Sequence, residues 1–224
     1  MGQYAPPATQ LGLFDSEQTA VDTSFAAAHR IALDETSWIE HVPGWLSGSA
    51  AVFDTMRDTA PWEQRERWMY DRKVTEPRMT AEYRDLAAAP QAVLHTIAAA
   101  LSGHYGVRYD GLWMNFYRDH QDGTGWHADR PVSQAESAIV PVLSLGAQRR
   151  FLIRPVGGGR STIIQPMGGD LVVMGGRCQR DWQHCVPKQK TLAGSRISLN
   201  FTSGEQTART GREQTARASG RPTI

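Results

Sequence analysis

The sequence predicts an α+β fold, with helices and strands in an N-terminal part followed by a continuous β-sandwich. Helical periodicity occurs only before residue 110, whereas short apolar runs separated by Gly, Pro and Asp follow one another after it. Of the 224 residues, 40% are hydrophobic and 21% charged, which is ordinary for a globular protein and excludes a mainly disordered, coiled-coil or collagen-like chain. Because no linker interrupts the chain, we expect one domain with an N-terminal extension.

The N-terminal part is predicted to alternate between extended and helical segments. Residues 30–45 read as extended as far as a turn at Pro43-Gly44, and residues 48–58 as a short amphipathic helix. Residues 64–84 alternate loosely and carry many charges, which indicates one or two strands with a turn near Glu76-Pro77.

The strongest helical pattern covers residues 90–102. Pro90 suits the first helical position, apolar residues recur on one face, and Gly103 marks the end. No helix of useful length fits beyond residue 110. The strands predicted there cover residues 111–118, 138–145, 149–154, 161–165, 170–174, 182–186 and 195–202.

The net charge of +1 conceals two unlike parts of the chain. Residues 1–136 carry 11 Lys and Arg against 19 Asp and Glu, whereas residues 137–200 carry 9 against 2. Residues 201–224 add 4 basic and 2 acidic residues. Near-neutrality is therefore a cancellation, and the basic stretch is compatible with a polyanionic partner.

Cys178 and Cys185 are the two cysteines, and their spacing fits no common zinc pattern. We expect free thiols in a reducing compartment and hence a cytoplasmic protein. No apolar run approaches the ~20 residues that a membrane span requires, and the N-terminus does not read as a signal peptide. The sequence therefore predicts no membrane association.

His127-Ala128-Asp129 is the first sign of a metal site. On a strand, residues i and i+2 point to the same face, so this His and this carboxylate can bind one ion. His184 is the only histidine after position 127 and would complete two His and one carboxylate, the ligand set of non-haem Fe(II) oxygenases. Taken alone, His-x-Asp also fits a surface His beside an Asp.

Three further residues fit a 2-oxo acid bound to such an ion. Asn115 and Tyr117 share one face of a predicted strand, and Arg196 lies on another strand twelve residues after His184. A buried Arg pairs with a carboxylate through two hydrogen bonds, and a phenol can add one more. Each residue also has a purely structural interpretation: Asn115 as a strand-end amide, Tyr117 as a core aromatic and Arg196 as a surface charge. Their joint order around the metal pattern favours the functional interpretation.

These residues fall within an ordered set of motifs that resembles the AlkB family of iron(II)- and 2-oxoglutarate-dependent alkylation-repair dioxygenases, of the bacterial type. The resemblance covers roughly residues 30–202. The matching motifs are Pro43-Gly44-Trp45-Leu46, Met69-Tyr70-Asp71-Arg72, Pro77-Arg78-Met79-Thr80-Ala81, Asn115-Phe116-Tyr117-Arg118, Gly125-Trp126-His127-Ala128-Asp129, Leu143-Ser144-Leu145-Gly146-Ala147 with Arg149-Arg150-Phe151, Gly169-Asp170-Leu171 with Met174-Gly175-Gly176, Trp182-Gln183-His184 with Val186-Pro187-Lys188, and Arg196-Ile197-Ser198-Leu199.

The resemblance implies a double-stranded β-helix, or jelly roll, at residues 111–202, with residues 30–110 forming a nucleotide-recognition lid. It implies a site whose residues group by role. Fe(II) would be bound by His127, Asp129 and His184; 2-oxoglutarate by Asn115, Tyr117 and Arg196, with Ser198 and Thr202 on the same strand; and the base by Tyr70, Arg78, Tyr83 and Trp126. Tyr83 is equally well read as a half-buried strand residue, and Trp126 as packing for the metal strand.

The implied activity is oxidative dealkylation of bases such as 1-methyladenine and 3-methylcytosine in DNA. Family enzymes convert 2-oxoglutarate and O2 to succinate and CO2, hydroxylate the N-alkyl group and release an aldehyde. The base must leave the stack to reach the metal. Phosphate contacts are expected from the basic stretch, with Arg149, Arg150, Arg180, Lys188 and Lys190 as candidates, and the protein is expected to be a monomer.

Two departures from the family pattern leave other functions open. Thr202 and Ser198 stand where relatives have Arg and Asn, and Pro131 stands where many carry an acid that reads the base; Glu136 is a candidate substitute for that acid. One alternative is the same chemistry on RNA, a protein or a small molecule. Another is a non-catalytic nucleic-acid-binding relative.

Both termini are predicted to lie outside the dioxygenase domain. Residues 1–29 would form a flexible arm, and the low-complexity residues 203–224 a disordered tail. Within the arm, Gln10-Leu11-Gly12-Leu13-Phe14 resembles the peptide by which bacterial repair proteins dock on the DNA sliding clamp. In that interpretation Leu13 and Phe14 fill an apolar pocket, while Gln10 and Leu11 add contacts. The alternative is that Leu13 and Phe14 attach the arm to its own domain.

Overall fold

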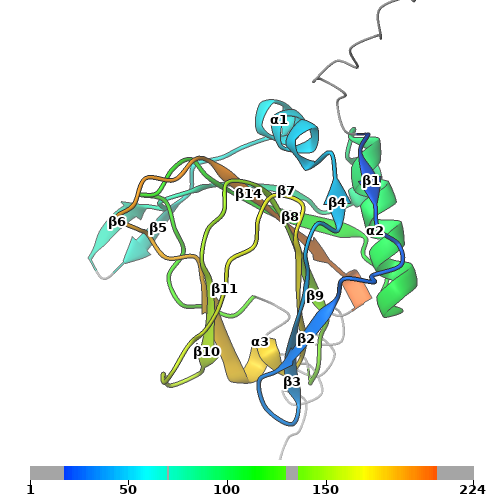
Figure 1. The fold of residues 1–224 in the computed structure, drawn as a ribbon. Coiled ribbons are helices and arrows are strands. Elements are labelled where there is room, and N and C mark those ends of the chain that lie inside the picture. The colour runs from blue at the N-terminus through cyan, green and yellow to red at the C-terminus, as the bar shows by residue number, and fades with distance from the viewer. Residues whose placement is uncertain (1–17, 70, 130–135, 206–224) are drawn as a thin grey trace, which may run out of the picture.

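Antiparallel β-structure dominates the fold, which contains few helices (Figure 1). The structure is a computed structural model that describes residues 18–69, 71–129 and 136–205. Two sheets face each other, which confirms the expected jelly roll. The larger sheet, in spatial order, contains β2 (His29–Ala32), β3 (Ser37–Val42), β12 (Leu171–Gly176), β9 (Val140–Gly146), β14 (Arg196–Thr202), β8 (Gly111–Tyr117) and β7 (Met79–Tyr83).

The smaller sheet has three strands, and it faces the inner side of the larger one. Its spatial order is β11 (Thr162–Ile164), β10 (Phe151–Pro155) and β13 (Trp182–Cys185). Two short pairs complete the strands: β1 (Ala20–Val21) with β4 (Leu46–Ser47), and β5 (Glu66–Met69) with β6 (Arg72–Thr75).

Helices α1 (Ser49–Thr59) and α2 (Ala92–Tyr105) cover the outer face of the larger sheet (Figure 1). Two further short helical elements are a 3₁₀ turn (Leu86–Ala88) and the one-turn helix α3 (Cys178–Asp181). In the described part of the chain, no helix is both long and apolar enough to cross a membrane.

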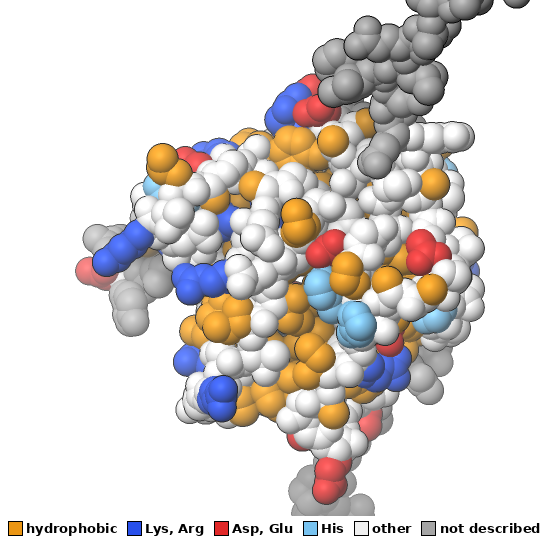
Figure 2. All heavy atoms as spheres, in the orientation of Figure 1, with side chains coloured by type: hydrophobic (Ala, Val, Ile, Leu, Met, Phe, Trp, Pro, Cys, Tyr) orange, Lys and Arg blue, Asp and Glu red, His pale blue; other side chains and the backbone are white. Residues whose placement is uncertain are grey.

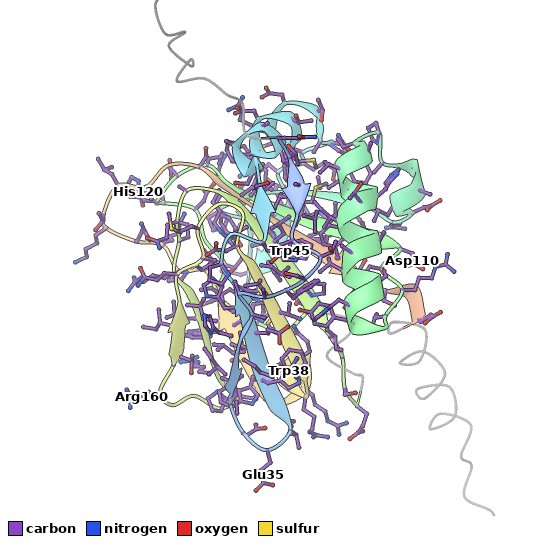
Figure 3. All side chains as sticks on the ribbon, turned by 45° about the vertical axis from the view of Figure 1, so that its right-hand side comes forward. Glu35, Trp38, Trp45, Asp110, His120 and Arg160 are labelled. Carbon is purple, nitrogen blue, oxygen red and sulfur yellow. The ribbon has the colours of Figure 1, made fainter. Side chains whose placement is uncertain are left out.

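The central strands of the larger sheet are therefore buried on both faces, and this explains the nearly continuous apolar runs of β9 and β12. The outer cluster joins Leu199 and Phe201 of β14 to Leu94 and Ile97 of α2. Trp45, labelled in Figure 3, is also fully buried in it. Each such side chain stabilises the fold by roughly 1.5–3 kcal/mol relative to an exposed one.

Alternation along β14 places its polar residues on the opposite face. Ile197, Leu199 and Phe201 belong to the outer cluster, so Arg196 and Ser198 point between the two sheets. The inner cluster there includes Val142, Phe151 and Ile153. The residue pattern of one strand thus builds a core on one side and a polar wall on the other.

Most predicted elements are confirmed, but α2 and the segment 64–84 differ from expectation. Helix α2 begins after Gln91, passes through Gly103 and ends at Gly106, whose φ of 67° is a left-handed C-terminal conformation. The chain reverses between β5 and β6 rather than near Glu76-Pro77, where it only bends before β7. Residues 64–84 thus hold three strands.

The expected boundaries at residues 30 and 110 do not separate structural units. Strands β3 and β7 lie within the larger sheet, so much of the predicted lid belongs to the jelly roll itself. The predicted flexible arm is already packed before residue 30, because Phe25 is buried and stacks on His104. Beyond β14, Ser203 is buried and the amide of Gly204 donates to Asp110.

Candidate metal centre and adjoining cavity

The three predicted metal ligands converge in space. One ligand atom from each of His127, Asp129 and His184 lies within 4.8 Å of the other two. Asp129 Oδ1 is 3.8 Å from His127 Nε2 and 3.6 Å from His184 Nε2. Two imidazole nitrogens and one carboxylate oxygen at this spacing suit a transition metal such as Fe(II).

His127 and His184 face each other across an isolated β-bridge rather than along a regular strand. The amide of His127 donates to the carbonyl of His184 at 3.1 Å, and the reverse bond measures 2.8 Å. His127 Nδ1 lies 2.8 Å from the carbonyl oxygen of Gly125, which assigns its proton to Nδ1 and leaves Nε2 free for a metal. His127 and Asp129 thus present their ligand atoms to the same place, as expected of residues i and i+2 on a strand, although they lie outside a regular strand.

Gln179 of α3 holds Asp129 through two reciprocal hydrogen bonds. The amide of Asp129 donates to Gln179 Oε1 at 2.8 Å, and Gln179 Nε2 donates to Asp129 Oδ2 at 3.0 Å. Oδ2 is occupied in this way, so Oδ1 is directed to the two histidines. A side chain 50 residues away thus fixes the orientation of Asp129, which a regular strand would otherwise have fixed.

The electrostatics of the three ligands favour the states that bind metal. Burial, together with the neighbouring His184, lowers the pKa of His127, which favours the neutral imidazole. Burial alone would raise the pKa of Asp129, but the neighbouring His184 and His127, together with hydrogen bonds from His184 and Gln179, hold it below its usual value. Phe151 stacks on His184 at 5.3 Å between ring centroids and fixes that ring.

A small cavity adjoins these ligands. It is lined by His127 and His184, by the predicted cosubstrate residues Asn115, Tyr117, Arg196 and Ser198, and by Thr124, Val142, Phe151, Val186 and Asn200. Histidines and cosubstrate residues therefore share one space between the two sheets.

Arg196 is the residue that most clearly requires a partner in this cavity. It is 2% exposed, and its Nη2 donates to Ser144 Oγ at 2.9 Å, while Nε and Nη1 are buried without a hydrogen-bond partner. Burial lowers the pKa of Arg196, while Tyr117 opposes this change. A buried, positively charged guanidinium with two unpartnered donors requires an anionic acceptor, so the site fits a carboxylate of 2-oxoglutarate.

Asn115 links the cosubstrate face to Arg78 of the N-terminal part. Asn115 Oδ1 accepts from Arg78 Nε at 2.8 Å, and its Nδ2 donates to Ser198 Oγ at 3.3 Å. Arg78 also pairs with Glu76 at 3.1 Å, and its charge contributes to lowering the pKa of His127. Arg78 thus lies close to the metal centre, as the family motif implies.

The remaining predicted site residues lie elsewhere. Thr202 stands at the far end of β14 opposite Gly111 and does not line the cavity. Tyr83 is half-buried and packs against the outer cluster, and Trp126 stacks under Arg154 at 4.0 Å. Their roles remain predictions. Tyr70, Pro131 and the clamp-like Gln10-Leu11-Gly12-Leu13-Phe14 lie outside the described residues.

Two of the candidate phosphate contacts are engaged within the protein. Arg149 is 1% exposed, and its guanidinium donates to the carbonyls of Asp119, Asp122 and Pro187. Arg180 pairs with Glu136, which also pairs with Arg177.

Both cysteines are buried and free, and burial raises the pKa of Cys178 to about 12.

The sequence interpretation missed Gln179 and Asn200. Asn200 has the same strand parity as Arg196 and Ser198, so that signal was present in the sequence. The Oδ1 of Asn200 is buried without a hydrogen-bond partner. Gln179 gave no signal, because its role depends on how α3 packs against the segment that holds Asp129.

Comparison with known proteins assigns the class. A model of the 2OG-Fe(II) oxygenase superfamily matches residues 26–202, and the chain therefore belongs to that superfamily. The chain is 30% identical over 181 residues to the alpha-ketoglutarate-dependent dioxygenase alkB homolog 3 of Rattus norvegicus and to that of Homo sapiens. Each match covers 71% of this chain, and 61% and 63% of the respective relatives' lengths.

Further similarities support the same group. DNA oxidative demethylase ALKBH2 of Arabidopsis thaliana is 28% identical over 119 residues, covering 43% of this chain and 38% of that protein. These relatives confirm the resemblance to the AlkB family. Among solved structures, that of OsALKBH1 superposes with a TM-score of 0.55 at 14% identity, covering 78% of this chain and 100% of the other, which supports the shared fold.

Proposed function

We propose that the protein removes N-alkyl groups from bases of the 1-methyladenine and 3-methylcytosine type in DNA. In the overall reaction an N-methyl group, 2-oxoglutarate and O2 become N–H, formaldehyde, succinate and CO2. The observation that carries this proposal is Arg196, whose two unpartnered buried donors lie in the cavity that His127 and His184 also line. The relatives, which include proteins named DNA oxidative demethylases, support alkylated nucleic acid as the substrate class.

Each residue of the site has a definite task in this reaction. His127, Asp129 and His184 would hold Fe(II), which when bound activates O2 for oxidation of the alkyl carbon. Arg196 would bind one carboxylate of 2-oxoglutarate, with Tyr117 and Asn115 beside it. Gln179 orients Asp129, and the Gly125 carbonyl orients His127.

The base must leave its stacked helix to enter the site, because an alkylated nitrogen within the stack cannot reach ligands that lie at a cavity between the two sheets. Arg78, which precedes β7, donates a hydrogen bond to Asn115 and would border the entering base. Thr202 and Pro131 are the sequence features that favour the second candidate, the same chemistry on RNA, a protein or a small molecule. We further propose that the protein acts as a monomer in the bacterial cytosol.

The test combines the protein with Fe(II), ascorbate, 2-oxoglutarate and a 1-methyladenine oligonucleotide. We expect succinate and formaldehyde in equal amounts, and neither product with His127→Ala or Arg196→Met. Succinate without formaldehyde would reject the DNA-base substrate and favour the second candidate. Absence of succinate from the metal-loaded wild-type protein with every substrate tried would support a non-catalytic relative.

A further inference from the structure

A pair of histidines lies at the edge of the larger sheet, outside the metal centre. His29 of β2 and His41 of β3 are direct cross-strand partners. Residues directly opposite each other on antiparallel strands share one face, with Cβ atoms about 4.5–5.5 Å apart. Figure 2 shows histidine side chains close together on the face of the molecule where β2 and β3 run in Figure 1. At this spacing two imidazoles can bind a common ion.

The histidine pair belongs to the inner face of the larger sheet but lies away from the cavity. His41 is the partner of Val172, which belongs to the inner cluster, and Val172 is the partner of the cavity residue Val142. Because neighbouring strands lie about 4.8 Å apart, two such spacings put His41 roughly 10 Å from the strand that lines the cavity. An ion bound to this pair would therefore be separate from one bound at the metal centre.

Asp170 holds the ring of His41. Its Oδ2 lies 3.0 Å from His41 Nε2 and also accepts from the amide of Met167 at 2.9 Å. Its Oδ1 accepts from the amide of Gly44 at 2.8 Å, and the residue is only 6% exposed, so the carboxylate is fixed. In the neutral ring this contact places the proton of His41 on Nε2 and leaves the lone pair of Nδ1 for a metal. Metal-binding histidines typically have such a carboxylate behind them.

His29 is available as the second ligand. It belongs to an edge strand whose four residues are all exposed, and no group in the described part of the chain hydrogen-bonds to its ring. On the opposite face of the same two strands, Arg30 bonds Glu40 at 2.8 Å and stacks on Trp38 at 3.8 Å. Side chains thus join β2 to β3 on that face, and a metal would supply the corresponding link on the histidine face.

We propose that His29 and His41 bind a divalent transition-metal ion of the Zn(II) type, and that Asp170 positions His41 for it. Imidazole nitrogen suits Zn(II) and Cu(II), and water would complete the coordination. The ion joins β2 to β3 and so stabilises the edge of the larger sheet. This inference is independent of the proposed function, because it uses none of the residues of the metal centre or the cavity.

The test is isothermal titration with Zn(II), which gives the number of ions bound per chain and their affinity. Since the metal centre can also bind Zn(II), the titration uses His127→Ala/His184→Ala as well as wild type. We expect this double variant to retain one zinc ion per chain, and the further change His29→Asn to abolish that binding. Asp170→Asn should weaken the same site about 10- to 100-fold, because the ring of His41 loses the carboxylate that orients it.

The matched control is His95→Asn in the same background, which removes an exposed histidine of α2 whose ring lies 3.1 Å from the carbonyl of Ala89. It should leave zinc binding unchanged. Zinc binding that survives His29→Asn, or that is lost equally in His95→Asn, would overturn the proposal. Absence of bound zinc from the double variant at high micromolar concentration would overturn it as well.

Hydrogen exchange provides a second measurement, in the protein with its metal centre intact. Zn(II) should slow exchange of the amides of His29–Ala32 and Ser37–Val42 in wild type, because an ion that joins the two strands opposes their local opening. The same addition should leave exchange in these strands unchanged in His29→Asn. Equal slowing in both proteins would show that zinc acts elsewhere and would reject the link between β2 and β3.

Discussion

Asp129 is the candidate metal ligand whose position depends most on one neighbouring side chain. No strand or helix fixes it, and Gln179 occupies both its backbone amide and its outer carboxylate oxygen. Carboxylate ligands lacking such a partner rotate among several orientations and bind metal less well.

We therefore expect Gln179→Ala to weaken Mn(II) binding about 10- to 100-fold. Gln179→Glu should weaken it more, since it replaces a donor with a second negative charge beside Asp129. Isothermal titration with Mn(II) measures both effects. Gln91→Ala, which removes a buried amide bonded to Thr59, is the control that should retain wild-type affinity. A wild-type dissociation constant for Gln179→Ala would show that Asp129 is held by other means.

Helix α2 contains two glycines with opposite conformational requirements. Gly103 lies in the helix interior, and a methyl group added there meets nothing within 4 Å. Gly106 ends the helix with φ of 67°, which side chains other than glycine rarely adopt. The sequence marked Gly103 as the helix end, whereas the left-handed residue is Gly106.

The expected effects on stability therefore have opposite signs. Gly103→Ala should raise the free energy of unfolding by about 0.5–1 kcal/mol, because alanine favours a helix interior. Gly106→Ala should lower it by roughly 1–2 kcal/mol, because alanine is strained in the left-handed region. Urea unfolding of both variants measures the difference. Stabilisation of the protein by Gly106→Ala would contradict the observed helix end.

At the scale of the molecule, the metal centre joins segments that are distant in sequence. His127 and Asp129 lie in the segment after β8, whereas His184 belongs to β13 of the smaller sheet. A metal bound to all three ligands therefore binds the folded chain and stabilises it.

Mn(II) at about 100 times its dissociation constant should stabilise the fold by about 2.7 kcal/mol. For a chain of this size that corresponds to a rise in Tm of roughly 5–10 °C. Thermal unfolding monitored by circular dichroism, with and without Mn(II), provides the measurement. Asp129→Ala should show little rise, and removing the metal with EDTA should restore the original Tm. A similar rise in Asp129→Ala would mean that Mn(II) binds elsewhere.

The sequence by itself determined the strand-rich C-terminal half and the helix at 48–58, and it predicted the candidate metal and cosubstrate residues that the fold brings together. These depend on local periodicity and on short motifs, in which each residue type is required by the chemistry. It also indicated the basic character of residues 137–200. The predicted end of α2 was wrong because Gly103 and Gly106 stand close together, and only the backbone conformation distinguishes them.

The tertiary structure alone decided which side chains meet. Gln179 reaches Asp129 from 50 residues away, and Arg149 is buried under three carbonyls rather than free for phosphate. The supposed lid contributes β3 and β7 to the main sheet. Sequence patterns report the local face of an element, whereas these contacts arise from packing between elements distant in the chain, whose register no local pattern specifies.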